Sequence, residues 1–120
     1  MTIDRERLKA AKPQLTAHQF RSGPLAGETF HVRRMSAREH GQWLTQLVGM
    51  PEEQHVSQGG LLRVAMSWCD ESGVLLFDAS SADDMEELRS LDYAVVSDVE
   101  SAVNADAGAH MQVVAEAKKN

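Results

Sequence analysis

A chain of 120 residues with 42% hydrophobic and 25% charged residues has the size and composition of one globular domain, which disfavours wholesale disorder. Its formal net charge of −6 disfavours nucleic acid as the main partner, because binding to phosphates requires a basic surface. The single cysteine, Cys69, excludes an intramolecular disulfide and a cysteine-rich metal site, and is consistent with a reducing compartment.

The charges are divided unevenly along the chain. Residues 1–40 contain eight Lys and Arg against four Asp and Glu, whereas residues 41–120 contain four against fourteen. The simplest interpretation is ordinary solvated charge. The alternative is that the basic segment contacts an acidic surface on a neighbour or on another copy of the chain, and we therefore keep a homo-oligomer as an expectation.

The N-terminus predicts the compartment. It carries charges from its fourth residue onward and lacks the apolar stretch of a signal peptide. No apolar run approaches the roughly 18 residues that a membrane span needs. We therefore expect a soluble, cytoplasmic protein without a membrane segment.

Residues 1–35 are expected to form a short helix followed by a β-hairpin. Thr2 is placed to cap a helix over about 4–11. Strands are expected over 16–20 and 28–34, since apolar and polar residues alternate in the second of them and the turn between them is rich in Gly and Pro. A two-stranded hairpin is marginal alone, so it must lie against a helix or a partner.

Residues 36–120 are expected to form a helical body. Ser36-Ala-Arg-Glu39 is a capping box, in which the Ser hydroxyl and the Glu carboxylate satisfy each other's backbone amides. Helices are predicted over about 36–48, 53–69, 81–103 with a break at Ser90, and 109–120. The short apolar run 74–77 is either a strand stub or chain held in the core. The whole is predicted to be a single domain over 1–120, mainly α with a small N-terminal β-hairpin (α+β), its roughly five short helices packed as an irregular bundle.

Two apolar stripes stand out on the predicted helices. One side of the 36–48 helix carries Trp43, Leu44, Leu47 and Val48, and a later stripe carries Leu91, Val95, Val96, Val99 and Val103. Such stripes form either the core or a groove for an amphipathic helix. Trp43, Leu47, Val95, Val99 and Val103 are therefore both core candidates and partner-contact candidates.

The sequence offers no catalytic or metal-binding constellation. The histidines are not spaced at i, i+3 or i+4, although His18 and His31 would be close if the hairpin register pairs them. The acidic cluster 83–87 matches the favourable charges of a helix N-terminus. Cys69 is expected to be buried and inert, because Asp70 and Glu71 would raise the pKa of its thiol. We expect no enzyme activity, no metal and no cofactor.

Several short motifs follow one another in a distinctive order. These motifs are Lys9-Ala-Ala-Lys12-Pro13, Phe30-His-Val-Arg33-Arg-Met-Ser36-Ala-Arg-Glu39, the apolar run 61–69 ending in Asp70-Glu-Ser-Gly73, Phe77-Asp78 leading into the acidic 82–88, Asn104, and Lys119-Asn120. In this order they resemble the tail assembly chaperones of long-tailed bacteriophages and prophages. The resemblance spans nearly the whole chain. The chain departs from it in the hairpin turn 22–27, where the family usually has a Trp or Gly, and in the loop 50–58.

The resemblance implies a non-catalytic protein of the host bacterial cytoplasm. Such a protein would coat the long helical tape-measure protein, keep it soluble and recruit the tail-tube protein around it. Arg33 and Arg34 join the apolar candidates as partner-binding residues. The alternative is a small regulatory or adaptor protein of a mobile element that binds protein, or binds nucleic acid through Arg33, Arg34 and Arg38.

Overall fold

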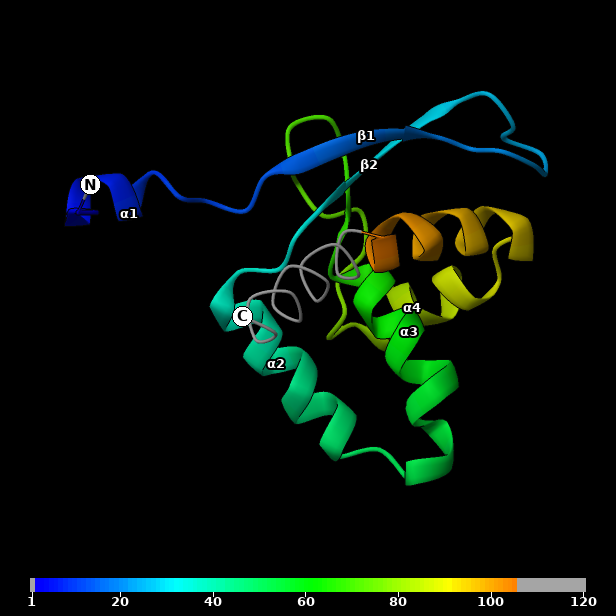
Figure 1. Cartoon of the computed structure of the whole chain (residues 1–120). Helices are drawn as coiled ribbons and strands as arrows, with labels where there is room; N and C mark the ends of the chain where they lie inside the picture. The colour runs from blue at the N-terminus through cyan, green and yellow to red at the C-terminus, as the bar shows by residue number, and fades with distance from the viewer. Residues whose placement is uncertain (1, 106–120) are drawn as a thin grey trace, which may run out of the picture.

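The computed structural model describes residues 2–105, which form a three-stranded antiparallel sheet and several helices, some of them packed beneath the sheet (Figure 1). The elements in order are α1 (Arg5–Lys9), β1 (Leu15–Gln19), β2 (Thr29–Arg33), α2 (Ala37–Val48), the 3₁₀ helix η1 (Glu52–Gln54), α3 (His55–Ala65), β3 (Trp68–Cys69), α4 (Ala82–Arg89) and a helical segment over 93–105. The predicted α+β class, mainly helical with an N-terminal hairpin, is confirmed. The predicted helix over 109–120 lies outside the described residues.

The predicted hairpin is confirmed, and its turn is attached to the last described helix. β1 pairs with β2 in an antiparallel register that sets His18 opposite Phe30. At the turn, Asp98 Oδ2 accepts hydrogen bonds from the backbone N–H groups of Arg21 (2.8 Å) and Ser22 (3.4 Å). The hairpin is therefore held against the helix over 93–105, as a marginal two-stranded unit requires.

The predicted helix over 53–69 is wrong at its C-terminal end. α3 stops at Ala65, and Trp68 and Cys69 form β3 alongside β2. The Arg33 N–H donates to Ser67 O (2.8 Å), which joins this segment to the sheet. Both β3 residues are buried, so sheet pairing outweighs their helical spacing. Residue Leu75 makes an isolated bridge to Cys69, which favours the strand-stub interpretation of 74–77.

α1 is shorter than predicted and has a different cap. The carboxylate of Asp4 accepts a hydrogen bond from the Arg7 N–H at 2.9 Å, so the prediction that Thr2 caps this helix is wrong. Asp4 is the better acceptor because its charge also suits the positive end of the helix. No residue of α1 is buried, and the helix lies beyond the end of the sheet (Figure 1).

The core lies between the sheet and the helices α3, α4 and 93–105. Figure 1 shows the 93–105 helix directly beneath the hairpin. The core-facing strand residues include Phe30 and Val32, and Trp68 joins them from β3. The helices contribute buried side chains that include Leu62, Val64, Met85, Leu88, Val95, Val99 and Val103.

Two glycines of the hairpin turn provide a test of how tightly the turn packs against the 93–105 helix. Gly23 and Gly27 have φ of 79° and 89°, where alanine is strained by about 1–2 kcal/mol. An added Cβ at Gly23 would also lie 2.9 Å from Ala94 Cβ, whereas one at Gly27 meets nothing within 4 Å. We expect Gly23→Ala to lower the unfolding free energy clearly more than Gly27→Ala in urea titrations. Equal losses would show that the turn does not rest tightly on the helix.

Candidate functional site

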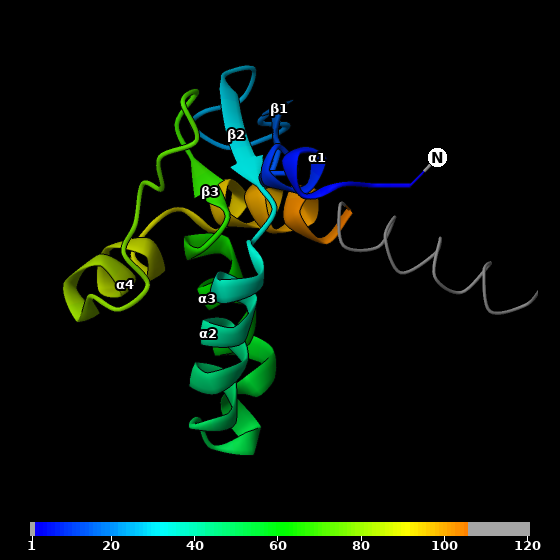
Figure 2. The same cartoon turned by 90° about the vertical axis from the view of Figure 1, so that its left-hand side faces the viewer.

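α2 is an amphipathic helix whose apolar side is only partly covered. It spans twelve residues, and none of them is buried. Together with α3 it extends away from the sheet in both views (Figures 1 and 2). Leu44 is 42% exposed and Val48 is 78% exposed. These two residues, one helical turn apart, form an apolar surface that we call the α2 ridge.

Trp43 and Leu47 lie beside the α2 ridge and face α3. The Trp43 indole Nε1 donates to Gly59 O at 3.1 Å. The Arg63 guanidinium lies over the same ring, with Cζ 5.6 Å from its centroid, which is a cation–π contact. An added Cβ at Gly59 would lie 2.8 Å from Leu47 Cδ1, so glycine permits the close approach of the two helices. Trp43 and Leu47 are half-buried, and their contacts hold α2 against α3 beside the ridge.

The other flank of α2 is polar. At 100° per residue, Gln42 and Gln46 lie on the opposite side of Trp43 from Leu44. They border a groove of about 680 Å³ between α2 and the segment 73–80. The exposed apolar surface of α2 is therefore confined to the side that carries Leu44 and Val48.

The structure places the second set of apolar candidates in the core, which is one of the two roles that the sequence left open. Val95, Val99 and Val103 are 4%, 0% and 8% exposed and belong to the core beneath the sheet. Their stripe is used to fix the 93–105 helix to the rest of the fold, so they have no surface left for a partner. The sequence could not distinguish the two stripes, because both have the same apolar spacing.

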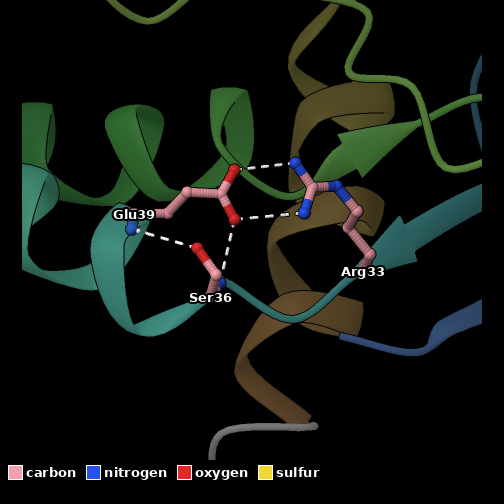
Figure 3. Close-up of polar contacts among 3 residues, drawn as sticks. All are labelled: Arg33, Ser36 and Glu39. Carbon is pink, nitrogen blue, oxygen red and sulfur yellow. Dashed lines mark hydrogen bonds and ion pairs between the residues drawn. The ribbon is translucent and has the colours of Figure 1, made fainter. Parts of the chain in front are cut away.

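Arg33 is engaged by the start of α2, whereas Arg34 is exposed. Figure 3 shows the Arg33 guanidinium facing the Glu39 carboxylate, with N···O distances of 3.0 and 2.7 Å. Glu39 also accepts from the Ser36 N–H (2.8 Å), and the Ser36 hydroxyl accepts from the Glu39 N–H (3.2 Å), so the predicted capping box is confirmed. Arg33 therefore joins β2 to α2, and its charge is already paired.

The surroundings of Glu39 change the pKa of its carboxyl. Burial raises the pKa of this carboxyl, but the Ser36 and Arg33 hydrogen bonds and the Arg33 charge outweigh that effect. The pKa of Glu39 is therefore lowered, and the ion pair remains formed at neutral pH.

The other titratable candidates remain apart. The hairpin register sets His31 opposite Ala17, so it does not pair with His18. Within residues 2–105, no three His, Cys, Asp or Glu side chains gather in a group that could hold a metal ion. Cys69 is buried, and burial raises the pKa of its thiol; Asp70 adds to this rise and Arg33 opposes it. The predicted direction of that pKa shift is confirmed.

The α2 ridge is a part of the described chain where two exposed apolar side chains keep helical spacing on one helix. Such a surface can pack against the apolar face of another helix. Over residues 2–105, no helix has the length and apolar character needed to cross a membrane. No family model matches the chain, and the searches of curated proteins and of solved structures found no similar protein.

Proposed function

We propose that this protein is a non-catalytic tail assembly chaperone of a long-tailed bacteriophage or prophage. It would bind the tape-measure protein in the host bacterial cytoplasm and promote assembly of the tail-tube protein around it. The observation that carries the proposal is the α2 ridge, an exposed apolar pair on a helix that projects from the body. The resemblance in motif order supports the tape-measure protein as the partner.

The ridge suits a long helical partner. A tape-measure protein presents apolar side chains at helical spacing, and Leu44 and Val48 offer the matching i, i+4 pair. Two side chains bury little area, so one contact would be weak. Many copies bound along one long partner would still hold it firmly when the copies also contact one another, because each further contact is then effectively intramolecular.

The charge of the chain suits the task of keeping such a partner soluble. The protein carries a net charge of −6, and copies arrayed on a partner would present that charge to solvent. A large net charge opposes association between assemblies.

The test is co-expression with the long, coiled-coil-rich protein encoded just downstream, followed by affinity capture. We expect a soluble complex that forms only when this chain is present. Leu44→Glu combined with Val48→Glu should reduce the captured partner at least about tenfold, since two carboxylates would be desolvated in the contact. The folded state should survive, because neither side chain is buried.

The matched control places the same charges elsewhere on α2. Gln42→Glu combined with Gln46→Glu changes two polar residues on the opposite flank of the helix by the same net charge. This variant should capture the partner as the unmodified chain does. Equal capture by all three forms would remove the ridge from the proposal, and an insoluble, unbound downstream protein would overturn the chaperone function itself.

A further inference from the structure

β1 is the outermost strand of the sheet, and alternate backbone groups along it point away from β2. The Phe20 N–H donates to Glu28 O at 2.9 Å, which places Phe20 among the residues that bond toward β2. In an antiparallel pair this role alternates along the strand. His18 and Thr16 therefore also bond toward β2, and the N–H and C=O groups of Leu15, Ala17 and Gln19 point outward.

The opposite edge of the sheet, at β3, already has hydrogen-bonding partners. Beyond β3, the Leu76 N–H donates to Trp68 O at 3.1 Å and Leu75 bridges to Cys69. Among the described residues, β1 thus carries the open edge of this sheet. Open edges usually carry charges, a proline or a bulge that prevents pairing. β1 has the sequence Leu-Thr-Ala-His-Gln, with no Lys, Arg, Asp, Glu or Pro, and its register with β2 is regular.

The structure also leaves room beside this edge. A cavity of about 920 Å³ lies between the core-facing side of the hairpin and the 93–105 helix. Its lining includes His18 and Phe30 from the sheet and Asp98 and Ala102 from the helix. The 93–105 helix therefore does not fill the space beneath β1. A strand added beside β1 would not meet a close-packed layer of helical side chains.

We propose that β1 pairs with β1 of a second copy of this chain, antiparallel and with the two-fold axis at Ala17. The occupant is a second copy because the edge is complementary to itself. A register centred on Ala17 sets Leu15 opposite Gln19 of the other copy and pairs every outward-facing residue, which no shifted register does. The strand is uncharged, so like charges do not oppose each other, and a small side chain lies at the axis.

The pairing makes one continuous antiparallel sheet from the two hairpins. Opposed residues of an antiparallel pair lie on the same face, so both helical layers would lie on the same side of that sheet. The cavities beside the two β1 strands would then meet beneath the new pair. This dimer does not depend on the chaperone function, and its tests use the protein alone.

Disulfide trapping tests the register. In a pair that exchanges both hydrogen bonds the Cα atoms are about 5.5 Å apart, which lies within the range a disulfide spans. Under mild oxidation we expect Ala17→Cys to cross-link to itself. Gln19→Cys alone and Leu15→Cys alone should not, whereas a mixture of these two variants should. The unmodified chain is the control for Cys69, which is buried.

Proline at the axis tests the hydrogen bonds. Ala17→Pro removes an outward-pointing N–H and leaves the bonds from β1 to β2 in place. We expect the unmodified chain to be dimeric by sedimentation and Ala17→Pro to raise the dimer dissociation constant at least about tenfold with an unchanged circular dichroism spectrum. A monomeric unmodified chain at about 100 μM would overturn the proposal, as would cross-linking of Gln19→Cys to itself as fast as Ala17→Cys; should the proline variant unfold, the cysteine series still decides.

Discussion

Replacing Phe30 with alanine is expected to lower the free energy of unfolding by about 3–5 kcal/mol, the usual cost of truncating a buried aromatic side chain. Phe30 is 5% exposed and is the second residue of β2. Its ring centroid is 4.4 Å from that of Phe20 and 5.4 Å from that of His18. Because small domains are stable by only about 5–15 kcal/mol, this loss would remove a large part of the total stability.

Two further variants test whether the loss comes from the void that Phe30→Ala leaves in the core. Phe30→Leu keeps much of the volume, so we expect a clearly smaller loss than for alanine. Tyr93→Ala removes an aromatic ring that is 84% exposed and should change the unfolding free energy by less than about 0.5 kcal/mol. Urea unfolding followed by tryptophan fluorescence measures all three. A loss below about 1 kcal/mol for Phe30→Ala would contradict the placement of the hairpin over the helices.

Replacing Arg33 with alanine is expected to cost about 1–3 kcal/mol at pH 7. Breaking a fully buried ion pair costs about 3–5 kcal/mol, and an exposed pair contributes about 0–1 kcal/mol. The side chains of Arg33 and Glu39 are 19% and 18% exposed, which places this pair between the two limits. The bidentate geometry shown in Figure 3 favours a substantial loss.

The cost of this replacement should depend on pH. The pKa of Glu39 in the folded protein lies below its ordinary value of 4.5, so its carboxylate stabilises the fold above that pH and loses this effect as the pH falls through the folded pKa. The difference between the unmodified chain and Arg33→Ala should therefore narrow below pH 4.5. Glu39→Gln and the double variant complete a mutant cycle. An additive cycle, or a pH-independent difference, would contradict a coupled pair.

The sequence determined the local structure well where neighbouring residues carry the signal. Ser36 and Glu39 predict a helix start because the capping box is completed within one turn. The hairpin is likewise predicted from local alternation and turn residues, and the structure confirms it. The cap of α4 is also local, since the Ser81 side chain accepts from the Asp84 N–H. Helix caps and strands of this kind can be predicted from neighbouring residues alone, because their hydrogen bonds and their alternation of apolar and polar residues are short-range.

The tertiary structure decided which apolar surfaces are covered. Trp68 and Cys69 have helical spacing, but they pair with the edge of β2 that β1 leaves free and so form a strand. The valines of the 93–105 helix and the leucines of α2 follow similar patterns, yet the former lie beneath the sheet while Leu44 faces solvent. The physical reason is that burial depends on contacts distant in sequence, and periodicity gives the apolar side of a helix without saying what covers it.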